Sequence, residues 1–115
     1  MIKLYGIKTC GSVKKALKFF KDNSIEFEFI DFKKEQPSCE KIDYWIEKVG
    51  ISKLFNSRGT KYRTLKLKEL NLDSSDKRDW LCKEYLLVKR PVIELKNGDV
   101  LVAYDEELYK EVFNA

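Results

Sequence analysis

The chain has 115 residues, the common size of one domain, and 43% of them are hydrophobic, which supplies enough apolar surface for a core and argues against disorder. The 23 basic and 19 acidic residues leave a net charge of only +4, and the lysines are spread along the chain, which favours a charged surface over a nucleic-acid interface. The first residues are too polar for a signal peptide, and no stretch approaches the roughly 18 apolar residues of a membrane span. We therefore expect one cytoplasmic domain over residues 1–115 that binds neither nucleic acid nor a membrane.

The N-terminal part of the sequence predicts a strand, a helix and a second strand. Alternating residues indicate a strand over 2–5, which Gly6 ends, and a clearer one over 25–31. Between them we predict a helix that begins at Thr9 or Cys10 and ends near Asn23. Its apolar positions recur at helical spacing, with lysines on the opposite face: Val13, Ala16, Leu17 and Phe20.

The middle of the chain is predicted to be mostly helical. Ser38 is a suitable N-cap for a helix that runs to Gly50, and a short helical turn follows. We predict a polar loop, NSRGTKYR, over 56–63 and a charged helical segment over about 64–70. Asp73 or Ser74 then caps a helix whose apolar residues are Trp80, Leu81, Tyr85 and Leu86.

The C-terminal part predicts a hairpin and a last helix. The pair Arg90-Pro91 interrupts the helical pattern, and a strand over 92–95 follows. Asn97-Gly98 indicates a two-residue hairpin turn into a strand over 100–102. The apolar spacing over 105–113 predicts the final helix.

This order of elements predicts an α/β protein with a thioredoxin-like, four-stranded mixed sheet. Two strands joined through a helix are expected to be parallel with a right-handed crossover, and the closing hairpin is antiparallel. The pattern is therefore β-α-β followed by β-β-α. The helical middle, at about 37–88, is an insertion between the second and third strands.

Cys10 is the first candidate for chemistry because it lies at the predicted start of a helix. Unpaired backbone N–H groups and the positive end of the helix dipole stabilise a thiolate there, and Lys8, Lys14 and Lys15 add positive charge. A thiolate attacks disulfides, oxyanions and peroxides. The structural alternative is a small capping or buried cysteine. Position 13 is Val, so the motif is C-G-S-V rather than C-x-x-C, and turnover needs an external thiol or another cysteine of the chain.

The other cysteines, Cys39 and Cys82, are not expected to form a disulfide, because a cytoplasmic compartment keeps thiols reduced. Cys39 lies in the first turn of a helix and Cys82 lies in an apolar stretch, where a small buried side chain is its expected role. Either one remains a candidate for resolving an adduct on Cys10. The chain has no histidine and no close cysteine pair, so we expect no metal site and no bound cofactor.

Two further segments are candidates for binding an anion. Pro91 stands at the start of a strand, where thioredoxin-like folds keep a cis proline beside the active cysteine, and Arg90 would direct its guanidinium toward an anion bound there. An ordinary helix-stop proline is the alternative. The loop over 56–63 combines Arg58 and Arg63 with a glycine, which suits either an anion pocket or a solvated basic loop.

Taken together, the Cys10 motif, NSRGTKYR, KRPVI and the ending NGDVLVAYDEE resemble the arsenate reductase-like family over essentially the whole chain. The family includes glutaredoxin-dependent arsenate reductases, glutathione-linked relatives and Spx-type regulators. The resemblance implies a thioredoxin fold with Cys10 as the redox cysteine. We expect Gly11, Ser12 and Pro91 to belong to the same substrate site.

The resemblance also implies an oxyanion clamp of three arginines. Arg90 supplies one and Arg58 or Arg63 a second, whereas the third would fall within residues 101–104, where Ala103 and Tyr104 stand and no arginine is present. The function implied is a thiol-dependent reductase that acts on an oxyanion or a small-molecule thiol substrate, with glutathione as co-substrate and glutaredoxin as a partner. The alternative is a redox-responsive regulator of the Spx type that binds the RNA polymerase α-subunit.

Overall fold

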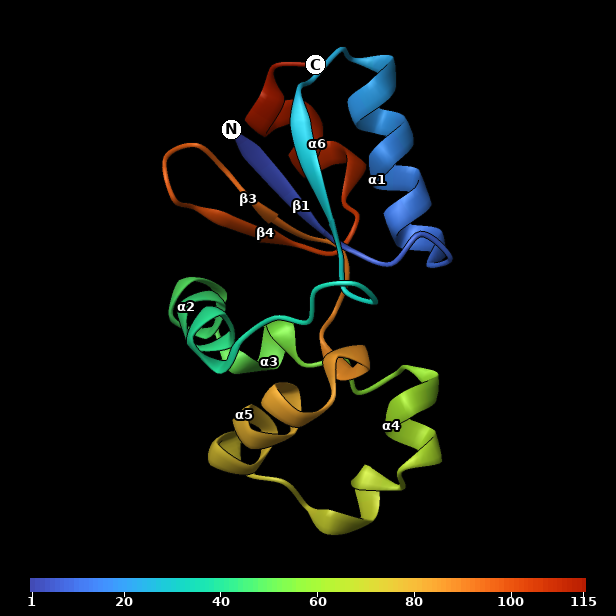
Figure 1. Cartoon of the computed structure of the whole chain (residues 1–115), viewed down its shortest axis with the longest axis vertical. Coiled ribbons are helices and arrows are strands. Elements are labelled where there is room, and N and C mark those ends of the chain that lie inside the picture. The colour runs from blue at the N-terminus through green and yellow to red at the C-terminus, as the bar shows by residue number, and fades with distance from the viewer. The chain divides into compact units, whose positions relative to one another are not determined.

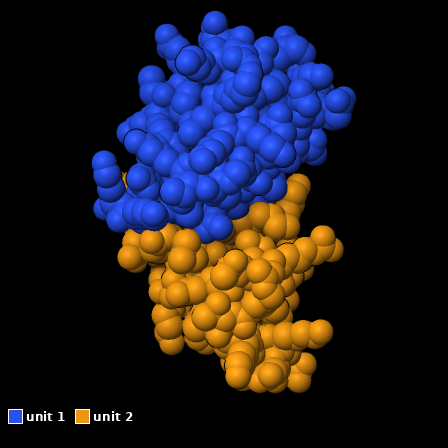
Figure 2. Space-filling model, turned by 90° about the vertical axis from the view of Figure 1, so that its right-hand side faces the viewer, with its two compact units in different colours: residues 1–34, 90–115 blue, residues 35–89 orange.

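The structure, a computed structural model, describes all residues from 1 to 115. It contains two compact units, which Figure 2 distinguishes by colour. We call residues 1–34 with 90–115 the sheet unit, and residues 35–89 the helical unit. That the two units fold as one domain stays a prediction. No helix of the structure is both long and apolar enough to cross a membrane.

The sheet unit contains the predicted four-stranded mixed sheet (Figure 1). Strand β1 pairs in parallel with β2 and antiparallel with β3, and β3 pairs antiparallel with β4, so the spatial order is β2-β1-β3-β4. This is the thioredoxin-like arrangement. The elements of this unit are β1 (Ile2–Gly6), α1 (Gly11–Asp22), β2 (Phe27–Asp31), β3 (Val92–Glu94), β4 (Val100–Val102) and α6 (Glu106–Phe113).

Helices α1 and α6 pack on one face of this sheet. Leu4 of β1 and Ile93 of β3 are cross-strand partners on that face, and both are fully buried. From α1, Phe20 enters the same cluster, where its ring lies 5.0 Å from that of Phe27 and 5.2 Å from that of Phe113, measured between centroids. The periodic apolar positions of α1 therefore face the sheet, as the spacing predicted.

Two details of the sheet unit differ from the prediction. Strand β2 begins at Phe27 instead of residue 25, because the Ile25 N–H bonds the Phe20 carbonyl and so still belongs to the end of α1. The β3–β4 hairpin has a three-residue turn instead of a two-residue one. The Gly98 N–H bonds the Leu95 carbonyl, and Gly98 takes φ 93°, which is a type I turn followed by a left-handed residue.

The helical unit is built from short helices inserted between β2 and β3. These are α2 (Cys39–Val49), α3 (Ile51–Leu54), α4 (Thr60–Thr64), the 3₁₀ helix η1 (Leu67–Leu70), α5 (Ser74–Lys83) and the 3₁₀ helix η2 (Tyr85–Leu87). The Ser38 hydroxyl caps α2, as predicted, and Asp73 caps α5 in a reciprocal capping box with Asp76. Its buried side chains include Ile42, Trp45, Leu54, Leu67, Leu81 and Leu87.

Three predictions in the helical unit need correction. The helix expected to contain Tyr85 and Leu86 ends at Lys83, because Glu84 is extended, and these two residues lie in η2. Residues 56–63 are not entirely a loop, because α4 begins at Thr60. The predicted helical segment over 64–70 is interrupted by Lys66, which takes the left-handed φ of 55°, and only a 3₁₀ turn over Leu67–Leu70 follows it. A left-handed residue cannot continue an α-helix.

The expectation that no disulfide forms is also wrong. The structure pairs Cys39 of α2 with Cys82 of α5 as a disulfide, with their Cα atoms 5.1 Å apart. Cys82 is partly exposed instead of buried, and Cys39 is exposed. Sequence position gave no sign of this contact, because 43 residues separate the two cysteines.

Candidate functional site

Cys10 lies in a tight turn between β1 and α1. Its N–H bonds the Ile7 carbonyl at 3.2 Å, which holds the cysteine close to the end of β1. Gly6 permits α1 to approach the strand closely, since a Cβ at this position would lie 2.6 Å from a methyl carbon of Val13. The helix therefore begins at Gly11, directly after Cys10.

The Cys10 sulfur is free, half-buried and not used in capping. Cys10 occupies the N-cap position of α1, yet its side chain makes no capping hydrogen bond, and it packs against the edge of the core cluster. The first turn of this 12-residue helix contains no acidic residue that would neutralise the positive end of its dipole. The following Gly11 and Ser12 are exposed, and a Cβ built on Gly11 meets no atom within 4 Å.

Two of the three lysines expected near Cys10 can be placed, Lys8 by a ring contact and Lys15 by a pocket that it lines. The Lys8 ammonium lies over the ring of Phe29, 6.0 Å from its centroid. Lys15 lines a surface pocket of about 270 Å³ between α1 and α6, together with Lys18, Phe19, Asp22, Asn23, Tyr104, Glu106, Lys110 and Ala115. Cys10 is not among the lining residues. The helix N-terminus is thus the better-supported source of positive potential at the sulfur.

One edge of the sheet brings the Cys10 turn and the Arg90-Pro91 segment together. Tyr5 of β1 is registered opposite Val92 of β3, so the end of β1, from which the Cys10 turn departs, lies beside the start of β3. The Arg90-Pro91 peptide bond is cis, one of the two alternatives that the sequence left open, and Pro91 is buried.

The segment after β4 reaches the same edge but carries no guanidinium. The Ala103 N–H bonds the Pro91 carbonyl, and Ala103 takes a left-handed φ of 71°. Its carbonyl accepts a 2.7 Å hydrogen bond from the Tyr109 hydroxyl. Burial, together with the neighbouring Tyr104 and Asp105, raises the pKa of Tyr109, so this hydroxyl remains a donor at any pH in ordinary use.

Arg58 and Arg63 lie in the helical unit and share a pocket of about 460 Å³. The Arg63 guanidinium, in α4, donates to the Arg58 carbonyl at 2.8 Å and to the Thr60 hydroxyl at 3.4 Å, so it stabilises the turn that precedes this helix. The Arg58 side chain makes no hydrogen bond or ion pair, and the backbone N–H of Arg58 bonds the Asn56 side-chain oxygen. Of these two arginines, Arg58 is therefore better suited to bind a ligand.

The same pocket contains cations that the sequence did not single out. Its lining includes Lys66 and Lys68, with Ser57, Tyr62 and one carboxylate, Glu69. Lys66 and Lys68 lie after the predicted loop, in the segment over about 64–70 that was expected to be helical. In the sequence these two lysines are separated by a single residue. Exposed surface segments show the same pattern, so it did not indicate a pocket.

The comparisons with known proteins agree with this architecture. The family model described as the ArsC family matches residues 5–112. An uncharacterized protein of Haemophilus influenzae is 34% identical over 114 residues, which cover 98% of this chain and 99% of that protein. Two solution structures are similar over nearly their whole lengths. SACOL0876 from Staphylococcus aureus COL is 37% identical with a TM-score of 0.78, covering 96% of this chain and 97% of that one.

The second of these structures, an arsenate reductase (ArsC) related protein from Brucella melitensis, is 32% identical with a TM-score of 0.77, covering 99% of this chain and 95% of that one. The family match spans both the Cys10 turn and the Arg90-Pro91 segment. This chain therefore belongs to the ArsC family.

Proposed function

We propose that this chain is a thiol-dependent reductase whose nucleophile is Cys10 and whose substrate is an oxyanion or a glutathione mixed disulfide. The observation that carries the proposal is the free sulfur at the N-cap of α1, on the sheet edge shared with the Arg90-Pro91 segment. Membership of the ArsC family and the Brucella melitensis relative, whose name refers to arsenate reductase, support it. A cytoplasmic setting, which would supply glutathione, is part of the proposal.

For a mixed disulfide, the reaction consists of two thiol–disulfide exchanges. The Cys10 thiolate attacks the glutathione sulfur, the Cys10–glutathione bond forms, and the substrate thiolate leaves with the electron pair and takes up a proton. A second glutathione thiolate, or glutaredoxin, then attacks the glutathione sulfur held on Cys10. When glutathione attacks, glutathione disulfide leaves and the Cys10 thiolate is restored. One glutathione thiol is consumed, because the other half of the glutathione disulfide comes from the substrate's own mixed disulfide. When glutaredoxin attacks instead, it leaves with the glutathione bound to it as a mixed disulfide.

In this scheme the chain contributes the nucleophile and the anion contacts. The amides of Gly11 and Ser12 at the start of α1 stabilise negative charge on the sulfur and on a bound oxyanion. We assign Arg90 to the anionic groups of the substrate, and a contact from Arg58 stays a prediction. The backbone next to Pro91 would pair with the thiol-bearing ligand.

A glutathione mixed disulfide is the better-supported substrate of the two. Reduction of an oxyanion such as arsenate would need the third arginine of the clamp, and the segment that reaches the sheet edge contains Ala103 and Tyr104 instead. A charge-assisted contact of this kind contributes about 1.5–3 kcal/mol. A mixed disulfide, in contrast, has most of its binding groups away from the reacting sulfur.

The nucleophile is tested by measuring alkylation against pH. In a Cys39→Ser, Cys82→Ser chain, Cys10 is the only thiol, and its rate of reaction with iodoacetamide should already be level at neutral pH. The same chain with Cys10→Ser gives the background. A rate that continues to rise beyond about pH 8.5, where an ordinary free thiol ionises, would contradict the proposal.

The substrate is tested by turnover. Reduction of a mixed disulfide between glutathione and a cysteine peptide should require Cys10 and glutathione, and arsenate should be reduced far more slowly in the presence of glutaredoxin. An Ala103→Arg variant should narrow that gap if the missing guanidinium is the reason. Equal rates for the two substrates in the native chain would remove the preference stated here.

The regulator of the Spx type, which would bind the RNA polymerase α-subunit, stays a prediction without a specific observation in its favour. Regulators of that kind generally carry a second thiol three residues after the first. Here position 13 is Val13, which is fully buried in the core cluster against Gly6. Failure to retain the purified α-subunit on the immobilised chain, in both redox states, would exclude it.

A further inference from the structure

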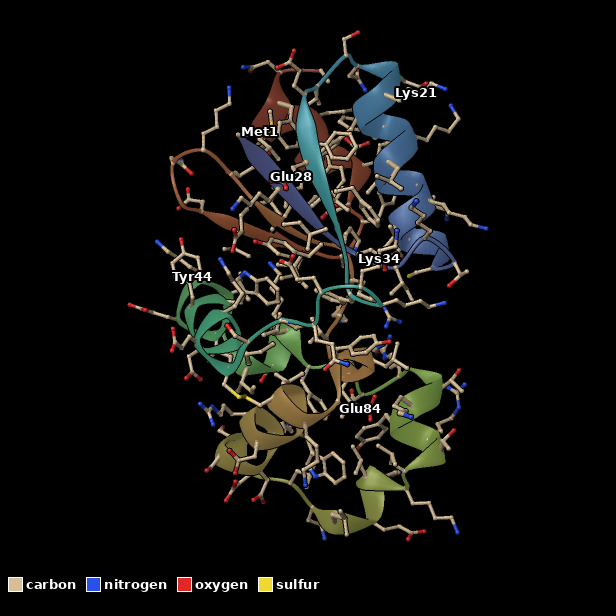
Figure 3. All side chains as sticks on the ribbon, viewed as in Figure 1. Met1, Lys21, Glu28, Lys34, Tyr44 and Glu84 are labelled. Atoms are coloured by element: carbon tan, nitrogen blue, oxygen red, sulfur yellow. A yellow bond between two sulfur atoms is a disulfide. The ribbon has the colours of Figure 1, made fainter.

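Two interactions join helices α2 and α5. The first is the disulfide between Cys39 and Cys82, which Figure 3 shows as a yellow bond between the two helices. The second is a bidentate ion pair, in which Arg78 donates from Nε and Nη2 to the two carboxylate oxygens of Asp43, both at 2.9 Å. The two residues that each helix supplies are four positions apart in the sequence. The disulfide and the ion pair therefore lie one helical turn apart, on the sides of α2 and α5 that face each other.

The two cysteines are placed so that a disulfide between them can open and close. Cys39 is exposed and Cys82 is partly exposed, so a soluble thiol or disulfide reaches them without unfolding the unit. Their Cα separation of 5.1 Å lies within the range that disulfides require, so bond formation needs no movement of the backbone. Cys39 is also the first residue of an 11-residue helix capped by Ser38, and the free amides there stabilise a thiolate when the bond is open.

We propose that Cys39 and Cys82 form a second redox site of this chain, a dithiol–disulfide couple that exchanges with low-molecular-weight disulfides of the glutathione class. Cys10 takes no part in it, and the proposal does not depend on the function assigned to Cys10. We expect the relative position of α2 and α5 to be the same in both redox states. The Asp43–Arg78 pair and buried side chains of each helix, among them Ile42 and Leu81, hold the two helices together.

The chemistry of the couple balances in two exchanges. The Cys39 thiolate attacks one sulfur of glutathione disulfide, forms a mixed disulfide and releases one glutathione, which takes up a proton. The Cys82 thiol then gives up its proton and attacks the Cys39 sulfur, which forms the Cys39–Cys82 bond and releases the second glutathione. Two cysteine thiols are oxidised and one disulfide is reduced to two thiols. Excess glutathione drives the same steps in reverse.

The couple is tested in the full chain carrying Cys10→Ser. The protein is equilibrated in buffers with a range of ratios of glutathione to glutathione disulfide, quenched with acid, and alkylated with N-ethylmaleimide before intact mass spectrometry. We expect two main species, one with both cysteines alkylated and one with neither, and a transition with the dependence of a two-electron couple. The control Cys10→Ser, Cys82→Ser should instead accumulate glutathione on Cys39, because no second thiol releases it.

Three results would overturn the proposal. A pair that stays oxidised in excess glutathione, or stays reduced in excess glutathione disulfide, is not a reversible couple with this class of partner. Stable glutathione adducts in the chain that retains both Cys39 and Cys82 would show that the second exchange does not occur. Loss of helical circular dichroism on reduction would show that the bond is a structural requirement, since the proposal expects the same spectrum in both states.

Discussion

The sheet unit and the helical unit are stabilised by different means. The sheet unit has four paired strands and a cluster of aromatic rings from α1, β2 and α6, and its single cysteine, Cys10, is left free at the sheet edge. The helical unit has short helices, and a disulfide and a bidentate ion pair join α2 to α5. The comparison teaches that the sheet unit leaves its one sulfur unbonded, whereas the helical unit uses both of its sulfurs to join two helices. Short helices are weakly stable on their own, and in the helical unit the disulfide adds a covalent link between two of them.

The largest expected effect follows from removing the free sulfur. Cys10→Ser should lower kcat for a glutathione mixed disulfide by about 1000-fold or more, because a serine hydroxyl does not ionise at neutral pH. The free energy of unfolding should change by less than about 1 kcal/mol, since the side chain makes no capping hydrogen bond. Turnover and urea denaturation of the same preparation measure the two. Retained activity would place the nucleophile elsewhere and remove the contrast between the units.

The aromatic cluster of the sheet unit is tested by Phe20→Ala. The Phe20 side chain is fully buried among the rings of Phe27, Tyr109 and Phe113, so its truncation should cost about 3–5 kcal/mol of unfolding free energy. Leu70 of the helical unit is 56% exposed, and Leu70→Ala should stay within about 0.5 kcal/mol. Urea denaturation measures both variants. Similar losses would mean that Phe20 does not anchor the cluster.

The close approach of β1 and α1 predicts a smaller effect. Gly6→Ala places a methyl group 2.6 Å from a side-chain carbon of Val13, in a fully packed interior, and should cost about 1–3 kcal/mol. Gly11→Ala is the matched control, because its new Cβ meets no atom within 4 Å and alanine favours the helix. Thermal unfolding compares them. If the two variants unfold at the same temperature, Gly6 is not required for the close approach of β1 and α1 that positions the Cys10 turn.

The smallest effect is expected for the exposed ion pair of the helical unit. Hydrogen bonds from Arg78, and then its positive charge, hold the pKa of Asp43 below its usual value. The stability from this carboxylate is therefore present above the unfolded pKa of about 3.9 and is lost as the pH falls through the lower folded pKa.

The advantage of the native chain over Asp43→Asn, measured as the difference in urea midpoint, should thus shrink between about pH 5 and pH 3. Arg78→Lys keeps the positive charge but cannot donate two parallel hydrogen bonds to Asp43. At the higher pH it should therefore lower the urea midpoint by part of the amount that Asp43→Asn does. A difference in urea midpoint that does not change with pH would show that the pair contributes nothing to α2–α5 packing.

The fold of the sheet unit followed from the sequence because its strands and helices have clear periods. The apolar spacing of α1 and the alternation in β2 each had one interpretation, and a helix between two strands required a parallel crossover. The boundaries were less accurate. The start of β2 depended on a backbone bond from Ile25 to α1, which local composition does not reveal.

The helical unit was harder to predict because its helices are too short for periodicity to define. Helix α4 has five residues, and Lys66 and Asn71 adopt left-handed conformations that their residue types do not require. The disulfide was missed for two reasons. It depends on tertiary packing across 43 residues, and the expected redox environment argued against it. The sequence predicted that Cys10 lies at the start of a helix and that Pro91 lies at the start of a strand, whereas it did not predict that Lys66 and Lys68 line the pocket of the helical unit.

The three-residue turn between β3 and β4 gives this protein a practical attachment point. Asn97 is exposed, and the turn lies at the end of β3 opposite to the one that meets the Cys10 edge. A reporter peptide inserted after Asn97 would leave the backbone bonds of the sheet intact and keep its bulk away from the reacting thiol. The chain could then be immobilised or labelled at this turn for kinetic work without adding a further cysteine.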